Sequence, residues 1–201
     1  YGPRVWAIGG GKGGIGKSVI AANVAVQIAQ SGPRVAIVDA DLGGANLHTL
    51  LGVGSPGANL SDFISRKVAR LDEVMVPTPV DNLFLVSGAK ALVEIANLNF
   101  GQKSKLLRHI NALDVDHVVL DLGAGSAFNV IDFFLAARKG VLVVVPEPTS
   151  VENAYHFLKA AFFRKIKRAE PRDEVRKVVK EIMNGGEREA VRTPRDLISK
   201  I

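Results

Sequence analysis

The chain has 201 residues, of which 47% are hydrophobic and 23% charged, enough apolar material for the core of one ordinary domain. It contains no cysteine, which excludes disulfides, thiolate zinc sites and cysteine-ligated iron–sulfur clusters. No apolar run reaches the ~20 residues of a membrane-spanning helix, and no secretory signal pattern opens the chain, so we expect a cytoplasmic protein that is not transmembrane.

The formal net charge of +6 is unevenly placed, because most of the excess Lys and Arg lies between Ser150 and the end of the chain. A run of charge on a helix is most often a solvated surface. A patch for nucleic acid, acidic lipid or an acidic partner is the alternative. Composition alone leaves both open.

Short apolar runs alternate with segments of helical periodicity along most of the chain. Taken in order, strands are predicted over Arg4–Gly9, Arg34–Asp39, Leu83–Val86, His117–Asp121 and Val141–Val145. Helices are predicted over Lys17–Gln30, Lys103–Asn111, Asn129–Ala137 and Ser150–Lys167, the last with a capping box of Thr149 and Glu152.

Buried strands that alternate with helices are typical of an α/β fold. We therefore predict a three-layer, doubly wound, mostly parallel sheet with helices on both faces. Residues 1–168 are assigned to this domain. Residues 169–201 are charged and lack a strand signal, so we assign them to a basic helical C-terminal extension of the same domain.

The segment between the first strand and the first helix matches the phosphate-loop pattern G-x-x-x-x-G-K-[ST]. Its glycines allow the backbone N–H groups to wrap a phosphate, and the helix that follows presents further N–H groups to the same anion. Lys17 would reach the β- and γ-phosphates, and Ser18 would ligate Mg²⁺. The predicted nucleotide-binding residues are Gly11, Lys12, Gly13, Gly14, Ile15, Gly16, Lys17, Ser18 and Val19.

Lys12 is a second lysine in this loop, which an ordinary phosphate loop does not require. A charge at that place could stabilise phosphoryl transfer in the manner of an arginine finger. We therefore expect Lys12 to act in catalysis together with Lys17. A solvated surface role is the alternative.

Three aspartates follow predicted strands at the edge where ligands bind in open α/β sheets. Asp39 and Asp121 end their strands, and Asp41 lies two residues beyond Asp39. Because Mg²⁺ prefers oxygen ligands, we predict Asp121 and Asp39 as metal residues beside Ser18. Asp41 is predicted to orient or activate the attacking water. Caps of loops and helices are the alternative for all three.

These motifs resemble the MinD/ParA family of deviant-Walker ATPases, over about Val5 to Lys167. The resemblance rests on GGKGGIGKS at 10–18, VDADLGGANL at 38–47 and VLDLGAG at 119–125. Within that family the sequence HTLLG at 48–52 is most similar to the MinD-like branch, which includes the flagellar-number regulator FlhG.

The resemblance implies a slow Mg²⁺-dependent ATPase that forms a homodimer with ATP sandwiched between the subunits. It implies that Lys12 reaches the partner subunit's nucleotide, that Asp41 activates water, and that hydrolysis dissolves the dimer. It further implies a partner that stimulates the ATPase, and a role in positioning division machinery, flagella or similar structures.

Two functional questions stay open at this stage. The alternative to a positioning switch is a partition protein of the ParA type, which would bind DNA non-specifically through the basic C-terminal quarter. Peripheral association with the inner face of the membrane is open as well, since Arg195–Ile201 is too short for a strong amphipathic anchor.

Overall fold

The computed structural model describes residues 2–41, 46–54, 57–88 and 98–169. The chain divides into two compact units, Tyr1–Leu158 and Lys159–Ile201, and the sheet with its surrounding loops belongs to the first. The predicted division at residues 168 and 169 stays a prediction. Apart from Ala169, the extension 169–201 lies outside the described residues.

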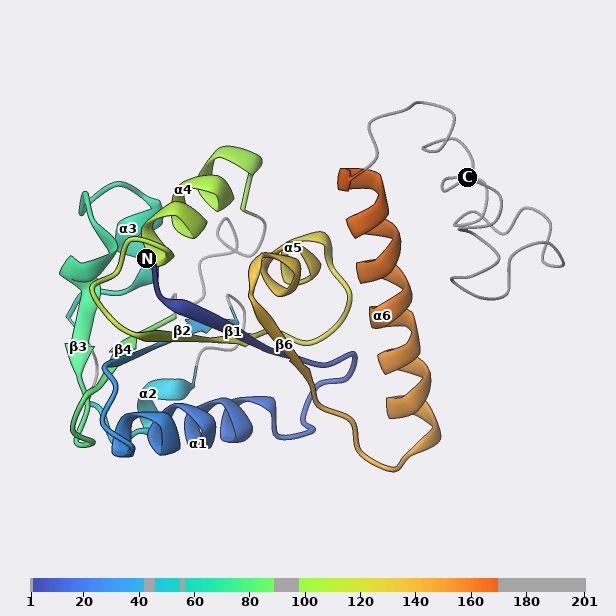
Figure 1. Ribbon diagram of the computed structural model, residues 1–201, viewed down its shortest axis with the longest axis horizontal. Coiled ribbons are helices and arrows are strands. Elements are labelled where there is room, and N and C mark those ends of the chain that lie inside the picture. The colour runs from blue at the N-terminus through green and yellow to red at the C-terminus, as the bar shows by residue number, and fades with distance from the viewer. Residues whose placement is uncertain (1, 42–45, 55–56, 89–97, 170–201) are drawn as a thin grey trace, which may run out of the picture. The chain divides into compact units, whose positions relative to one another are not determined.

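Six strands form one sheet in the order β3-β4-β2-β5-β1-β6 (Figure 1). The strands are β1 (Arg4–Gly9), β2 (Val35–Ala40), β3 (Met75–Pro77), β4 (Leu83–Val86), β5 (His117–Leu122) and β6 (Lys139–Leu142). All neighbours pair in parallel except β3, which runs antiparallel to β4. The predicted doubly wound α/β fold is confirmed.

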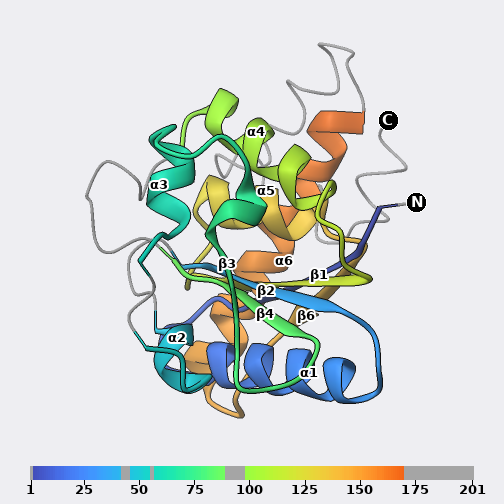
Figure 2. The ribbon, with the colours of Figure 1, turned by 90° about the vertical axis from the view of Figure 1, so that its left-hand side faces the viewer.

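Helices cover both faces of the sheet, as Figure 2 shows in side view. The helices are α1 (Lys17–Gln30), α2 (Leu47–Leu50), α3 (Leu60–Ile64), the 3₁₀ helix η1 (Leu71–Val74), α4 (Phe100–Ile110), α5 (Phe128–Ala136) and α6 (Pro148–Ala169). α1 and α2 lie on one face, and α3, α4 and α5 lie on the other. Among the described helices, none combines the length and apolar character needed to cross a membrane.

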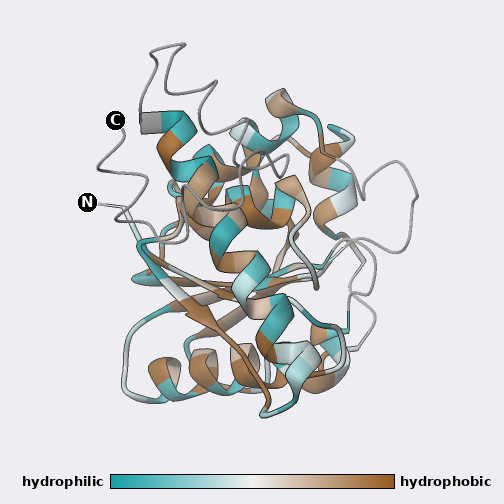
Figure 3. Ribbon diagram, turned by 90° about the vertical axis from the view of Figure 1, so that its right-hand side faces the viewer, coloured by the Kyte–Doolittle hydropathy of each residue, from teal (hydrophilic) through white to brown (hydrophobic). Residues whose placement is uncertain are grey.

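Two hydrophobic cores result from the alternation of side chains along the strands. Ala7 joins the core beneath α3, α4 and α5, while Ile8 joins the core beneath α1. In α1 the residues against the sheet are small, among them Ala21 and Ala25, which are fully buried. The sheet is largely brown in Figure 3, as expected of strands that are buried on both faces.

Several predicted boundaries differ from the structure. Helix α4 begins at Phe100 and not at Lys103, and two further differences lie near the end of β6. The strand is Lys139–Leu142 and not Val141–Val145, because its partner β1 ends at Gly9, opposite Leu142. Helix α6 begins at Pro148, so Thr149 lies inside its first turn and does not cap it. Proline suits that position because the first helical N–H groups need no intrahelical partner.

Candidate nucleotide site

The phosphate loop connects the end of β1 to the start of α1. Gly14 and Gly16 have φ angles of 73° and 88°, in the left-handed region that favours glycine. Gly16 occupies the N-cap of α1, where it has no side chain to cap the helix, and no acidic residue lies in the first turn. The first N–H groups of α1 and its positive dipole end therefore suit an anion at the loop.

Lys17 is the first residue of α1 and is buried, with 7% of its surface exposed. Its ammonium donates a hydrogen bond to the carbonyl oxygen of Lys12, at 3.1 Å. The side chain thus folds back over the loop that it follows. Val19, the last residue of the predicted binding set, is an exposed residue of α1.

Neighbouring segments hold the loop in place. The N–H of Gly125, in the turn after β5, donates to the carbonyl oxygen of Gly10 at 3.2 Å. Gly11 packs so closely on α6 that a Cβ placed there would lie 2.4 Å from the backbone carbonyl of Asn153. The shape of the loop therefore depends on β5 and α6 as well as on its own glycines.

The three predicted aspartates come together beside the loop. Asp39 and Asp121 are register partners on β2 and β5, and each is 1% exposed. Asp41 leads away from β2, and a Cβ placed on Gly123 would lie 3.1 Å from its Oδ1 atom. The Asp41 carboxylate therefore lies against the turn that follows Asp121.

The two buried carboxylates differ in their partners. Asp39 accepts hydrogen bonds from the backbone N–H groups of Asp41, at 3.3 Å, and Leu47, at 3.2 Å. Asp121 lies beside the Ser18 hydroxyl, which stabilises the charged form of the carboxylate. Its Oδ1 atom is buried without a hydrogen-bond partner among the described residues. Asp39 thus bonds two backbone N–H groups that follow β2, while Asp121 keeps an acceptor atom available next to Ser18.

Burial dominates the electrostatics of this pair. It raises the pKa of Asp39 to about 7, against the hydrogen bond from Leu47, and the charge of Asp121 raises that pKa further. Burial likewise raises the pKa of Asp121 to about 6, although the Ser18 hydroxyl stabilises its charged form. A cation between Asp39, Asp121 and Ser18 would relieve both effects.

Mg²⁺ fits these donors. In nucleotide sites it takes one or two carboxylates together with phosphate oxygens and waters. Ser18, Asp121 and Asp39 offer such a set, and the unpartnered Oδ1 atom of Asp121 lies within it. The described residues hold no group of three or more His, Cys, Asp or Glu side chains suited to a metal ion.

Lys12 lies at the surface of the loop and makes contacts that were not predicted from the amino-acid sequence. Its ammonium forms an ion pair with Glu147 at 2.5 Å and donates to the Thr149 hydroxyl at 3.3 Å. The side chains of Lys12 and Glu147 are 36% and 56% exposed. The segment from Pro146 to Ser150 therefore contacts the phosphate loop.

Some residues of the site escaped sequence reasoning or lie outside the description. Leu47 contributes a backbone N–H, and Asn153 contributes its backbone and Cβ, which most residue types share, so their side-chain identities carried no signal. Glu147 could have been found as an acidic residue just past a strand that neighbours β1. Gly43 and Gly44, in the second matching motif, lie outside the described residues.

The sequence of the chain matches a known protein family. A ParA sequence-family model, described as NUBPL iron-transfer P-loop NTPase, matches residues 3–169. The chain belongs to the ParA/MinD family of P-loop NTPases. The resemblance stated from the motifs is thereby confirmed.

Relatives within the ParA/MinD family share much of this chain. The antiactivator FleN of Pseudomonas aeruginosa is 35% identical over 157 residues, covering 78% of this chain and 55% of FleN. The flagellum site-determining protein YlxH of Helicobacter pylori is 32% identical over 162 residues, covering 76% of this chain and 52% of YlxH. The chain thus spans about half the length of these curated relatives.

A solved structure in the ParA/MinD family has the same fold. It is the septum site-determining protein MinD of Pyrococcus horikoshii, complexed with Mg-ADP, at a TM-score of 0.68 and 26% identity. The match covers 77% of this chain and 63% of that one.

Proposed function

We propose that this protein binds ATP with Mg²⁺ at the loop 10–18 and hydrolyses it slowly as a switch that positions a cellular structure. The observation that carries the proposal is the buried pair of Asp39 and Asp121 beside Ser18, in which the Oδ1 atom of Asp121 has no hydrogen-bond partner among the described residues. The names of YlxH and MinD, which are site-determining proteins, support the positioning role.

Each residue has a part in this proposal. The loop N–H groups and Lys17 bind the phosphates, and Ser18 with Asp121 and Asp39 holds Mg²⁺. The metal, when bound, neutralises charge that develops on the phosphates. Asp41 orients the attacking water and accepts its proton, because its carboxylate lies against the turn at Gly123, beside the phosphate loop.

If Asp41 activates water and Lys17 binds the phosphates, alanine variants of the two residues should differ in ATP binding. Asp41→Ala should keep ATP binding and lose turnover, because the phosphate contacts are intact. Lys17→Ala should lose both. Equilibrium binding of a fluorescent ATP analogue and single-turnover phosphate release would measure the two effects separately. Normal hydrolysis by Asp41→Ala would show that Asp41 is not the group that activates water.

Lys12 is proposed to act on the nucleotide of a second subunit. In the described chain its ammonium is partly exposed and paired only with exposed groups, Glu147 and Thr149. Exposed ion pairs contribute little free energy, about 0 to 1 kcal/mol, so Lys12 can exchange Glu147 for a phosphate. The ATP-bound form of the protein is then a dimer.

Light scattering with Mg-ATP tests this role of Lys12. Wild-type protein should double its mass with ATP, and Lys12→Ala should stay monomeric while it still binds ATP. Lys67→Ala removes an exposed lysine on the surface after α3 and serves as the matched control. An unchanged ATP-dependent dimer in Lys12→Ala would remove the proposed role between subunits.

A second candidate function is ATP-dependent, non-specific DNA binding. The observation in its favour is the run of cations along the end of α6, in which Lys165, Lys167 and Arg168 are exposed. Charge reversal at Arg164, Lys165, Lys167 and Arg168 should then abolish binding to duplex DNA of unrelated sequences, measured at low salt. If the wild type with ATP does not bind DNA at low salt, this candidate is eliminated.

A further inference from the structure

A second cationic site lies at the opposite end of β1 from the phosphate loop. A cavity of about 290 Å³ is lined by Arg4, Val5, Trp6, Arg138 and Lys139. Arg4 begins β1, Lys139 begins β6, and Arg138 immediately precedes it. Since β1 is six residues long, roughly 16 Å of strand separates this cavity from Gly9.

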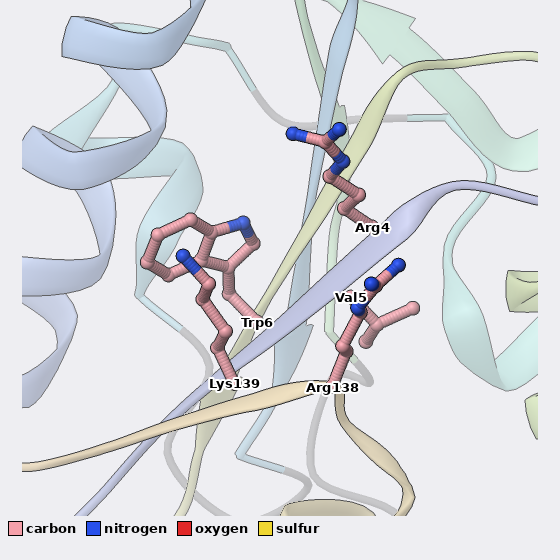
Figure 4. Close-up of a pocket in the computed structure, with 5 residues that line it drawn as sticks. All are labelled: Arg4, Val5, Trp6, Arg138 and Lys139. Atoms are coloured by element: carbon pink, nitrogen blue, oxygen red, sulfur yellow. The ribbon is translucent and has the colours of Figure 1, made fainter.

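Backbone hydrogen bonds and strand pairing fix the positions of these cationic residues. The N–H of Arg4 donates to the carbonyl oxygen of Asp116 at 2.9 Å, and the N–H of Arg138 donates to that of Val5 at 3.0 Å. Trp6 and Lys139 are register partners on β1 and β6. Figure 4 shows Lys139 lying along the Trp6 ring, with Arg4 projecting from the start of β1 and Arg138 from the residue before β6.

One wall of the cavity is rigid. The Trp6 indole N–H donates to Nδ1 of His117 at 3.1 Å, which fixes the ring between β1 and β5. The Lys139 ammonium lies 4.5 Å from the centre of that ring, a cation–π contact that holds the charge at the cavity. This arrangement differs from a set of freely moving surface lysines.

Within the described residues, no carboxylate forms an ion pair with the three cations. None of the ion pairs within the described part of the chain involves Arg4, Arg138 or Lys139. The nearby carboxylate of Asp116 accepts a hydrogen bond from the N–H of Arg34 and does not line the cavity. Burial lowers the pKa of His117, and the charge of Arg4 lowers it further, as expected beside concentrated positive charge.

We propose that this cavity binds a small, multiply charged phosphate anion, free or as part of a phosphorylated metabolite. Two guanidinium groups can each bond a phosphate through paired N–H donors, and Lys139 adds a third positive charge. A single carboxylate would neutralise only one of the three positive charges. The cavity volume is near the lower limit for small-molecule sites, which suits a compact anion.

The chemistry also limits the ligand. Because Lys139 covers a face of the Trp6 ring, a nucleobase gains no stacking surface there. ADP should therefore bind in this cavity no more tightly than pyrophosphate. An acidic protein segment is the competing ligand, and polyglutamate represents it in the test.

Trp6 is the only tryptophan of the chain, so its fluorescence reports on this cavity directly. We would titrate pyrophosphate into the full chain carrying Lys17→Ala, which removes phosphate binding at the nucleotide site, at constant ionic strength. Binding should change the Trp6 emission with saturation. Arg4→Gln and Arg138→Gln should each weaken it about tenfold, the effect of losing one charge-assisted hydrogen bond.

Matched variants make the result decisive. Lys67→Ala, which removes an exposed lysine elsewhere, should leave the pyrophosphate affinity unchanged. Both arginine variants replace exposed side chains, and circular dichroism would confirm that they fold. No saturable change at millimolar pyrophosphate, or equal affinity in Arg138→Gln, would overturn the proposal. So would a response to polyglutamate alone, or a clearly tighter response to ADP than to pyrophosphate.

Discussion

At the scale of single residues, Asp39 and Asp121 are the proposed metal ligands, and their burial is also a cost to the fold. They are neighbours in the sheet, each is almost completely buried, and burial raises both pKa values. A structural role alone would be better served by neutral side chains. This pairing is what a cation-binding site requires, and it makes the stability of the chain sensitive to pH.

We expect the metal-free protein to lose stability as the pH rises. In the folded chain the pKa of Asp39 is about 7 and that of Asp121 about 6, against an ordinary value of 3.8. The folded state therefore binds more protons than the unfolded state between about pH 4 and pH 7. The free energy of unfolding falls across that window by several kcal/mol, since each unit of raised pKa corresponds to about 1.4 kcal/mol.

Urea unfolding in the presence of a chelator would measure this change. Asp39→Asn should flatten the slope and raise the stability at pH 8. Asp81→Asn, at an exposed position, is the control and should change neither. A wild-type stability that stays level or rises between pH 4 and pH 7 would contradict the electrostatic argument.

At the scale of elements, the packing of the phosphate loop on α6 separates two glycines that look alike in sequence. A Cβ on Gly11 would meet the backbone of Asn153 at 2.4 Å, whereas a Cβ on Gly13 would lie 3.9 Å from Ala124. Gly11→Ala should therefore destabilise the fold by about 1 to 3 kcal/mol through overpacking. Gly13→Ala should cost much less, and chemical denaturation would compare them. Equal losses would mean that the loop does not pack on α6 in this way.

A buried ion pair joins α4 to α5. The Lys103 ammonium contacts the Asp132 carboxylate, with side-chain exposures of 11% and 1%, and also donates to Asn129 at 3.1 Å. Asp132→Ala leaves a buried charge unpaired and should cost about 3 to 5 kcal/mol. The double variant Lys103→Met with Asp132→Leu should recover most of that loss in urea unfolding.

The exposed pair of Lys67 and Asp62 provides the comparison, because its lysine is 73% exposed. Lys67→Ala should change the free energy of unfolding by less than about 1 kcal/mol. If Asp132→Ala were as mild as Lys67→Ala, the link between α4 and α5 would have no structural importance.

At the scale of the whole molecule, ligand binding and folding are linked because the proposed ligands contact several strands at once. Saturating Mg-ATP, at about 100 times its Kd, should stabilise the chain by about 2.7 kcal/mol. For a chain of this length that raises Tm by about 5 to 10 °C. Differential scanning calorimetry would measure the shift, which Lys17→Ala should abolish and Lys67→Ala should preserve. A wild-type Tm that Mg-ATP leaves unmoved would count against nucleotide binding.

The local pattern of the chain was enough to predict its fold class. Arg4–Gly9, Lys17–Gln30 and Leu83–Val86 were predicted at their observed bounds, because an apolar run or a helical period with clear stops is a local signal. The short edge strand β3 was missed, since three residues that include Pro77 carry little strand signal. The end of β6 depends on its partner β1, which no local pattern records.

The sequence by itself determined the phosphate loop, the three aspartates and the family, because those motifs are contiguous and their chemistry follows from residue type. Only the tertiary structure decided which groups meet. The pairing of Asp39 with Asp121, of Lys12 with Glu147 and of Trp6 with Lys139 depends on strand order and register. The same is true of the raised pKa values and the second cationic site, since burial and charge proximity exist only once distant segments of the chain have packed together.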